Sequence, residues 1–391
     1  MAIPFNRPYV AGKELEYIAE ACASGHLSGN GQFTWRAQAW LEEYSGSAKA
    51  LLTHSCTAAL EMAAILADIG PGDEVIMPSY TFVSTANAVV LRGGVPVFVD
   101  IRPDTLNLDE TLIEAAITSR TRAIMVVHYA GVSCAMDEIS AIAARHGLLV
   151  IEDDAQGIMA SYRGRPLGSL GNLAAISFHE TKNVISGEGG ALFVNDPRLV
   201  ERAEIIWEKG TNRTKFFRGQ VDKYTWVDIG SSYLPSELNA AFLYAQLESI
   251  ESIMRERLAL WHCYHDAFAP LEAQGLLRRP VVPPECTHNG HIYYIRVADL
   301  ATRTRVLDDL KAAGVGAVFH YVPLHTTVPG TTLCRAHGEL PVTLAVSDTL
   351  VRMPLWVGMP EAVVEQAVGI AARTVGTTSP ATISAAARGR A

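Results

Sequence analysis

The sequence lacks the features that mark three classes of protein. A net charge of −9 over 391 residues, with no basic stripe, argues against nucleic acid as a partner. No apolar run approaches the roughly 20 residues that a membrane-spanning helix needs. Residues 1–9 contain no apolar segment typical of a signal peptide. We therefore expect a soluble, cytoplasmic protein with no membrane partner.

Cysteine and lysine are both scarce. The six cysteines are scattered and form no Cys-x-x-Cys pair. Free thiols are therefore expected rather than a disulfide framework or a zinc site. Arginine greatly outnumbers lysine, so few lysines are available as candidates for covalent chemistry.

Hydrophobic residues, in contrast, make up 49% of the chain. A chain of 391 residues is long for one core, so two domains are expected. We predict a large domain over residues 1–250, a small C-terminal domain over residues 251–376 and a disordered tail over residues 377–391. The tail is rich in Thr, Ser, Ala and Arg, a composition that builds no core.

Segments typical of strands and helices alternate through the first half of the chain. Strands are expected at residues 48–52, 74–77, 95–100, 122–128 and 148–152, and helices at residues 57–68, 82–91, 108–117 and 136–146, the third capped by Asn107. This alternation predicts an α/β fold with a mostly parallel, doubly wound sheet, covered by helices on both faces. Ligands bind such sheets beyond the carboxyl ends of the strands, where residues 53–57, 78–82, 153–156 and 179–182 lie.

The flanking segments are predicted to be mainly helical. Residues 12–24 form an amphipathic helix with Leu15, Ile18, Ala19 and Cys22 on one face. Further helices are expected at residues 33–44, 196–209 and 235–271. Residues 210–233 form a long polar and aromatic segment without a clear period. Strands at 291–297 and 315–319 and helices at 302–313 and 361–375 predict a smaller α+β unit.

Lys182 lies in a polar turn between two predicted buried strands, residues 173–178 and 191–194. A flexible loop, Gly187 to Gly190, follows it. A lysine at a strand end, beside a loop that lets backbone come close, can hold a cofactor aldehyde as a Schiff base. Most lysines are exposed, so taken alone a surface lysine is the better interpretation.

Two further features extend the pattern. Ser55, Cys56 and Thr57 stand at a helix N-terminus, where free N–H groups, a hydroxyl and the helix dipole suit a phosphate. An isolated Ser or Thr there is more commonly an ordinary cap. Asp153 directly follows a predicted strand, where a carboxylate can keep a heteroaromatic nitrogen protonated. The alternative is a solvated loop acid, like its acidic neighbours.

Phe82 opens a helix at another strand end and can stack on a ring. In isolation a core aromatic is the commoner interpretation. Combined with Lys182 and Ser177, however, the features follow the chain order of a pyridoxal-phosphate site: phosphate cradle, ring stack, pyridinium partner and Schiff-base lysine.

Six stretches then carry a specific pattern. They are Ser-Cys-Thr-Ala-Ala-Leu at 55–60, Pro-Ser-Tyr-Thr-Phe-Val-Ser-Thr-Ala-Asn-Ala at 78–88, His-Tyr-Ala-Gly at 128–131, Glu-Asp-Asp-Ala-Gln at 152–156, Ser-Phe-His-Glu-Thr-Lys-Asn at 177–183 and Gly-Glu-Gly-Gly at 187–190. Over about residues 3–375 the chain closely resembles the sugar aminotransferases of the DegT/DnrJ/EryC1/StrS family. The resemblance implies the aspartate aminotransferase fold (fold type I), a homodimer, and pyridoxal 5′-phosphate bound in the large domain.

The resemblance also implies residue roles. Lys182 would hold the cofactor as a Schiff base, Asp153 would face the pyridine nitrogen, Gln156 would lie by the phenolic oxygen, Phe82 would stack on the ring, and Cys56, Thr57 and Ser177 would hold the phosphate. The amine of Lys182, once released, is tethered where it can shuttle a proton. One base for both half-reactions predicts ping-pong kinetics.

One branch of the family looks nearest. Residues 216–226 and 228–233 resemble the TDP-4-keto-6-deoxyglucose 4-aminotransferases, which make TDP-4-amino-4,6-dideoxy sugars from glutamate. Relatives often carry Asn or Arg where this chain has Leu234, a group that reaches the neighbouring subunit's phosphate. Ser231 or Ser232 is the candidate substitute. The configuration at C4, and whether the product enters an envelope glycan or a secreted natural product, stay open.

Candidate substrate contacts come from two segments. Arg213, Arg218 and Lys223 can neutralise a diphosphate, and Tyr224 or Trp226 can pack on thymine or sugar. The alternative is a surface loop that only braces the dimer.

The second segment holds His320, Tyr321 and His325, after a predicted strand. No third ligand is near, so a sugar-nucleotide contact is favoured over a metal. A purely structural role is about as well supported.

Two other functions compete with transamination on this fold. A sugar dehydratase on this fold would be expected to carry histidine in place of Lys182. A non-catalytic sugar-nucleotide-binding regulator is the alternative from another class. The set Asp153, Gln156 and Lys182 argues against it, as would a yellow colour in the purified protein.

Overall fold

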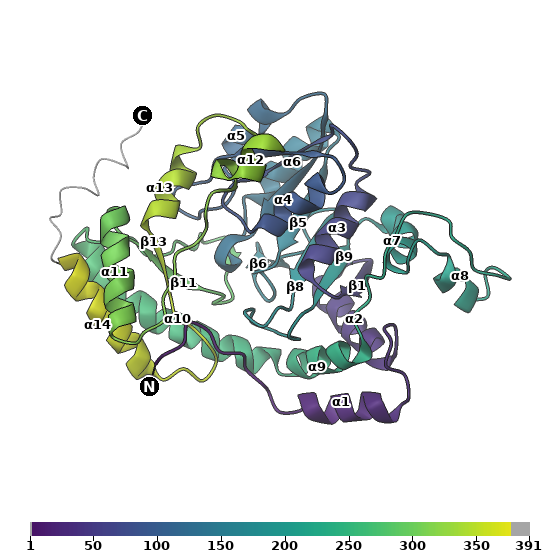
Figure 1. The fold of residues 1–391 in the computed structure, drawn as a ribbon, viewed down its shortest axis with the longest axis horizontal. Coiled ribbons are helices and arrows are strands. Elements are labelled where there is room, and N and C mark those ends of the chain that lie inside the picture. The colour runs from purple at the N-terminus through teal and green to yellow at the C-terminus, as the bar shows by residue number, and fades with distance from the viewer. Residues whose placement is uncertain (1, 377–391) are drawn as a thin grey trace.

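A computed structural model describes residues 2–376, and its centre is an eight-stranded sheet (Figure 1). The strand order is β1 (Lys49–Thr53), β9 (Gly190–Val194), β8 (Leu173–Ser177), β5 (Leu149–Asp154), β4 (Thr121–Val127), β2 (Glu74–Pro78), β3 (Val95–Val99) and β12 (Arg335–Ala336). All neighbours from β8 to β12 are parallel, and β9 runs antiparallel to both β1 and β8. The predicted mostly parallel sheet is confirmed.

Helices cover both faces of this sheet because its strands are apolar on both sides. On β8, Leu173 and Ala175 pack with α3 (Cys56–Leu66), α4 (Val83–Val90) and α7 (Val200–Trp207). The alternate residues Ala174 and Ile176 pack on the other face with α2 (Gln32–Ser45) and α9 (Glu237–Glu248). Further along that face lie α5 (Glu110–Ala116) and α6 (Met136–His146). Such two-sided burial is typical of a doubly wound sheet.

A second hydrophobic cluster lies toward the C-terminus. It joins α10 (Ile250–Ala273), α11 (Leu300–Ala312) and α14 (Glu361–Gly376) to the antiparallel pair β11 (Tyr293–Arg296) and β13 (Leu350–Met353). The consecutive helices α9 and α10 run along one edge of the molecule from the main sheet to this cluster (Figure 1). The division at residue 250 stays a prediction, and the predicted tail, residues 377–391, lies outside the described residues.

Three local predictions were wrong. The predicted cap Asn107 does not cap α5, since its side chain donates to the carbonyls of Val132 and Ser133. Asp109 caps the helix instead. Residues 315–319 form no strand, only the single bridges Ile3–Val315 and Val318–Arg352. His320, Tyr321 and His325 therefore follow an irregular segment rather than a strand.

The buried face of α1 (Glu14–Ala23) also differs from the prediction. Tyr17 and Ala21 are buried there, whereas Leu15 is 76% exposed. The cause is Glu14, whose carboxylate accepts from the backbone N–H groups of residues 11 and 12 and from Gln246. An inward carboxylate turns the neighbouring Leu15 outward.

Candidate active site

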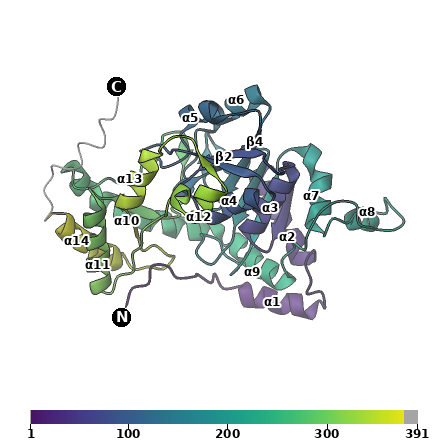
Figure 2. The same cartoon turned by 45° about the horizontal axis from the view of Figure 1, so that its top comes forward.

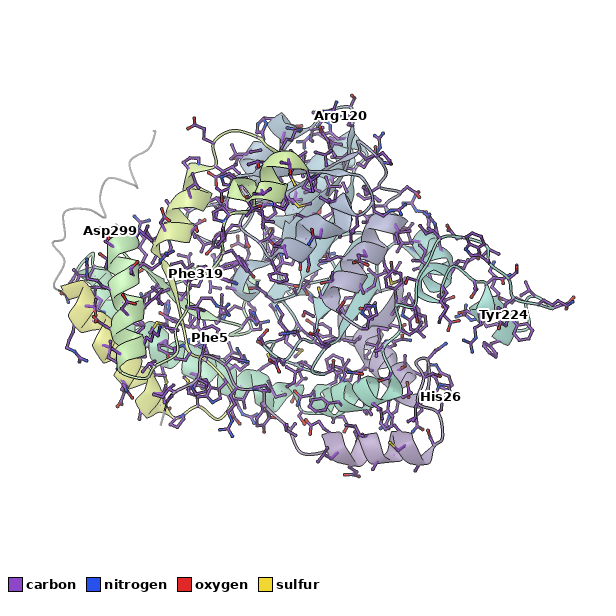
Figure 3. The ribbon with its side chains drawn as sticks, in the orientation of Figure 1. Phe5, His26, Arg120, Tyr224, Asp299 and Phe319 are labelled. Atoms are coloured by element: carbon purple, nitrogen blue, oxygen red, sulfur yellow. The ribbon has the colours of Figure 1, made fainter. Side chains whose placement is uncertain are left out.

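One cavity of about 650 Å³ opens at the carboxyl ends of β5 and β8, beside the N-terminus of α3. It is lined by nine of the predicted site residues: Cys56, Thr57, Phe82, Asp153, Gln156, Ser177, Lys182, His320 and Tyr321. Residues of the C-terminal cluster close its other side. Figure 3 labels two of its lining residues, Phe5 and Phe319, between the α11–α14 layer and the main sheet.

The N-terminus of α3 forms a cradle for an anion. Ser55 caps the helix by accepting from the Ala58 N–H at 3.1 Å. Cys56 and Thr57 form the start of the first turn of α3, where backbone N–H groups have no acceptor within the helix. The helix dipole also favours negative charge at this end. A Cβ at Gly190 would stand 2.5 Å from the Cys56 nitrogen. Glycine at this position therefore lets β9 pass close to the cradle.

Lys182 follows β8 in a tight turn, in which its N–H donates to the His179 carbonyl at 2.9 Å. Its side chain is partly buried in the cavity. Burial lowers the pKa of the Lys182 amine, while Cys56 and Asp153 oppose that shift. An amine that loses its proton more readily is better suited to act as a nucleophile and base.

Asp153 was predicted just after a strand, but the structure places it inside β5, which ends at Asp154. The side chain is 5% exposed, and Thr85 Oγ1 donates to its Oδ2 at 2.7 Å. Burial raises the pKa of this carboxyl, and the Thr85 hydrogen bond and the Lys182 charge oppose the rise. A cation placed against Asp153 would therefore gain a partner shielded from water.

Gln156 connects two parts of the cavity. Its Oε1 accepts from the Ala130 N–H at 2.8 Å, and its Nε2 donates to the Tyr321 hydroxyl at 3.2 Å. The Tyr129 hydroxyl lies 3.0 Å from His320 Nδ1. Burial lowers the pKa of His320 well below its ordinary value, so this ring is neutral near pH 7.

Three charged or titratable cavity residues that the sequence analysis did not single out come from the C-terminal half of the chain: Arg257, His291 and Arg352. Arg257 is 3% exposed and donates to the carbonyls of Gly290 and His291. His291 Nδ1 lies 2.9 Å from Asn183 Oδ1, beside the turn of Lys182. The one available signal was a charged residue inside an apolar strand, Val351-Arg352-Met353.

Four predicted substrate residues do not line the cavity. Arg213 and Lys223 are exposed, and Arg218 forms a paired contact with Glu204 at 2.7 and 2.9 Å. These three lie in an arm, residues 208–233, that carries α8 (Arg213–Phe217) away from the sheet (Figures 1 and 2). His325 instead hydrogen-bonds Ser79 Oγ at 2.7 Å. Their proposed roles stay predictions.

Other predictions fall outside the cavity too. Leu234 packs partly buried against the α3 and α7 cluster. Within residues 2–376 no group of three or more His, Cys, Asp or Glu side chains could hold a metal ion. No helix in the same range is long and apolar enough to cross a membrane. The cytoplasmic location stays a prediction.

The residues present fit pyridoxal phosphate. The α3 cradle suits its phosphate, the buried Asp153 carboxylate suits a protonated ring nitrogen, and the Lys182 amine suits its aldehyde. Fold and site together define a pyridoxal-phosphate-dependent enzyme of fold type I. A model of the DegT/DnrJ/EryC1/StrS aminotransferase family matches residues 8–371. The chain belongs to this family and is a sugar aminotransferase with pyridoxal phosphate as its cofactor.

Individual relatives agree over almost the full length. The GDP-perosamine synthase of Caulobacter vibrioides is 35% identical over 367 residues, covering 92% of this chain and 95% of that protein. The aminotransferase TlmJ of Streptoalloteichus hindustanus superposes with a TM-score of 0.88 at 28% identity, covering 96% and 99% of the two chains. DesV of S. venezuelae gives 0.86 at 30% identity, covering 97% and 100%.

Proposed function

We propose that this enzyme transfers an amino group from L-glutamate to TDP-4-keto-6-deoxy-D-glucose. The products are TDP-4-amino-4,6-dideoxy-D-hexose and 2-oxoglutarate. The observation that carries transamination is the meeting of Lys182, Asp153 and Gln156 in one cavity. The resemblance of residues 216–226 and 228–233 to TDP-sugar 4-aminotransferases supports the nucleotide and the position of amination.

The chain's own residues supply binding and proton transfer. When bound, pyridoxal phosphate supplies an electron sink for the carbon that gains or loses the amino group. Asp153, held by Thr85, keeps positive charge on the ring nitrogen. Lys182 Nζ removes a proton from the α-carbon of glutamate and later delivers one to C4 of the sugar. Because one tethered base serves both halves, ping-pong kinetics are expected.

A homodimer is part of this proposal. The arm at residues 208–233 exposes large apolar side chains, with Trp226 79% and Phe217 66% exposed. Exposed apolar surface of this kind favours burial against another protein surface. A second copy of the chain would cover the arm. Arg213, Arg218 and Lys223 of one copy would then lie near the cavity of the other copy. The alternative, in which the arm only braces the dimer, needs no contact with the nucleotide.

The direct test is incubation of the purified enzyme with glutamate and TDP-4-keto-6-deoxyglucose, followed by NMR of the product. The coupling constants at C4 also give the configuration of the new amine. The GDP-linked keto sugar is the matched control, because one relative is named GDP-perosamine synthase. Amination of the GDP sugar alone would overturn the proposed nucleotide but keep the sugar transamination.

Conversion of the keto sugar to a product that contains no nitrogen from glutamate would favour a dehydratase. Tight sugar-nucleotide binding by a protein that glutamate leaves unchanged would favour a non-catalytic regulator. Conversion of the bound cofactor to its amine form by glutamate alone, read by absorbance, excludes the second outcome.

A further inference from the structure

The carboxamide of Gln156 has a fixed orientation in the cavity wall. Its Oε1 accepts from the Ala130 N–H at 2.8 Å, and only the oxygen of a carboxamide can accept such a bond. The other end of the group is therefore the nitrogen Nε2, which donates to the Tyr321 hydroxyl at 3.2 Å. Nε2 carries two N–H groups, and within residues 2–376 the second one forms no hydrogen bond. This N–H is available to a ligand in the cavity.

The backbone of Gln156 is held independently of its side chain. Its carbonyl accepts from Asn289 Nδ2 at 2.8 Å. Asn289 is 1% exposed and also donates to the Ile158 carbonyl at 2.8 Å. The main chain at residue 156 is thus fixed without Tyr321, so the Tyr321 contact decides only how the carboxamide is oriented.

Tyr321 is itself a rigid support. Its ring packs nearly perpendicular to those of Tyr80 and Tyr129, with centroids 5.5 and 6.3 Å away. Its carbonyl accepts from Ser347 Oγ at 2.8 Å. Tyr321 lies 165 positions after Gln156, in the segment that follows α11. The C-terminal part of the chain therefore supports a residue that lies just after β5.

The Tyr321 hydroxyl is a neutral partner for Gln156. Burial raises the pKa of this hydroxyl, and the Arg352 charge only partly opposes the rise. A protonated hydroxyl that accepts from Nε2 directs its own O–H elsewhere. Neither partner changes charge near pH 7, so the contact holds the carboxamide in the same way across the neutral pH range.

We propose that Tyr321 is a positioning residue, whose hydroxyl holds the Gln156 carboxamide with its second N–H toward the phenolic oxygen of pyridoxal phosphate. This inference rests on the proposed function, in which Gln156 belongs to the cofactor site. A donor at that oxygen withdraws negative charge from it. The oxygen then attracts the proton of the cofactor-bonded Lys182 Nζ less strongly. Through Gln156, Tyr321 lowers the pH at which Lys182 Nζ loses this proton.

Two other roles for Tyr321 make different predictions. A contact with the sugar nucleotide leaves the absorbance of the cofactor unchanged while no sugar is present. A ring that only fills space acts through packing, and its hydroxyl is then dispensable. Tyr80 is the matched control for packing, because it is 1% exposed, contacts the Tyr321 ring and does not line the cavity.

The test follows the visible absorbance of the bound cofactor against pH, without substrate, in Gln156→Leu, Tyr321→Phe, the double variant and Tyr80→Phe. The midpoint should rise by about 1–2 pH units in Gln156→Leu, the scale of a hydrogen bond to a charged oxygen. Tyr321→Phe keeps the ring and should raise the midpoint by about half a unit. The double variant should match Gln156→Leu alone, since Tyr321 acts only through Gln156. Tyr80→Phe should titrate as wild type.

Four outcomes would overturn the inference: a wild-type midpoint in Tyr321→Phe, an equal shift in Tyr80→Phe, additive shifts in the double variant, or a wild-type midpoint in Gln156→Leu. The last outcome would remove Gln156 from the phenolic oxygen, whereas the sugar transamination is judged separately by NMR of its product. Thermal melting of the cofactor-free variants checks that all four fold, so that a shifted midpoint is not caused by unfolding.

Discussion

At the scale of single residues, the alternation of side chains along β5 separates two adjacent acids. Asp153 faces the cavity, whereas Glu152 is on the other face, with its Oε2 2.8 Å from His128 Nε2. Glu152 also accepts backbone N–H groups of Leu170 and Gly171. A one-residue shift along a strand reverses the face that a side chain occupies. The run of three acids at 152–154 therefore contains one cofactor ligand candidate rather than three.

Lys182→Ala should abolish both the visible absorbance of the covalently bound cofactor and turnover. The variant keeps the α3 cradle but has no amine in the cavity to bond an aldehyde. Lys311→Ala, at the exposed end of α11, is the control and should keep both properties. Retention of absorbance and turnover in Lys182→Ala would show that another lysine carries the cofactor.

Asp153→Asn should still bind pyridoxal phosphate but turn over about 100-fold more slowly, the scale expected when a positioned proton-transfer site is perturbed. Without the carboxylate charge, the ring nitrogen loses its proton more easily and withdraws electrons less strongly. Asp154→Asn is the matched control. Near-normal turnover of Asp153→Asn combined with a slow Asp154→Asn would reverse the assignment of the two acids.

At the scale of elements, the cradle depends on how closely β9 passes the start of α3. Gly190 pairs with Thr53 and Ser177 on its two neighbouring strands, next to the turn that leads into the helix. This explains why the loop Gly187 to Gly190 ends in glycine. Gly187 is favoured by its backbone conformation, because it has a positive φ of 78°. Gly190 is favoured for a different reason, because a Cβ there would collide with the backbone at Cys56.

Gly190→Ala should weaken cofactor binding and lower the free energy of unfolding by about 1–3 kcal/mol, the usual cost of overpacking. The added methyl group would displace the backbone of the α3 cradle rather than a flexible side chain. Gly70→Ala is the control, because its Cβ would meet only the Asp73 carboxylate at 3.7 Å. Calorimetric melting and cofactor titration measure both effects. Wild-type cofactor affinity in Gly190→Ala would contradict the close-approach argument.

Arg218→Ala tests whether the arm binds nucleotide. If it does, the Michaelis constant for the sugar nucleotide should rise far more than that for glutamate, and glutamate alone should still convert the cofactor. The loss of stability should be at most about 1 kcal/mol, because Arg218 is 52% exposed. Glu204→Gln is the matched control, since it breaks the same pair but keeps the arginine. Equal losses in both half-reactions would make the arm a structural brace.

At the scale of the whole molecule, segments distant in sequence are joined around the same sheet. Arg335 of β12 pairs with Glu74 of β2, and the parallel β12–β3 contact adds the late strand to the sheet edge. The N-terminal Ile3 pairs with Val315 near the other end of the chain. Residues from the first and the last part of the described chain also meet at the cavity, where Phe5 and Arg352 both form part of the wall.

The Glu74 cluster predicts a pH-dependent part of the stability. Burial alone would raise the pKa of Glu74, but hydrogen bonds from Arg335, Thr118 and Arg120 lower it to about 2. A carboxyl group whose pKa is lower in the folded than in the unfolded protein stabilises the fold at pH values above its unfolded-state pKa. This contribution is lost as the pH falls toward the folded-state pKa of about 2. Glu74→Gln should therefore cost on the order of 2–3 kcal/mol at pH 7. The difference in unfolding free energy between wild type and Glu74→Gln should shrink as the pH falls from 5 to 2. A difference that stays constant over this range would contradict the role of the Glu74 carboxylate.

The regular parts of the fold and the local motifs follow from the amino-acid pattern alone. The mostly parallel sheet follows from apolar segments at regular spacing, because strand burial on both faces needs near-continuous hydrophobic runs. The cradle at Cys56 and the turn of Lys182 follow from short stretches in which neighbours in sequence are neighbours in space. Asn107 and Leu15 were misassigned because distant partners, Val132 and Gln246, decide those local contacts.

The set of distant side chains that share the cavity, in contrast, depends on how the folded chain packs. Arg352 stands on a strand that the sequence pattern did not separate from core, and its place in the cavity wall is visible only once β13 is positioned. Arg257 and His291 likewise come from a helix and a loop with no cofactor motif of their own. The arrangement depends on long-range packing, such as the contacts between His291 and Asn183 and between Gln156 and Tyr321, and no local period encodes it.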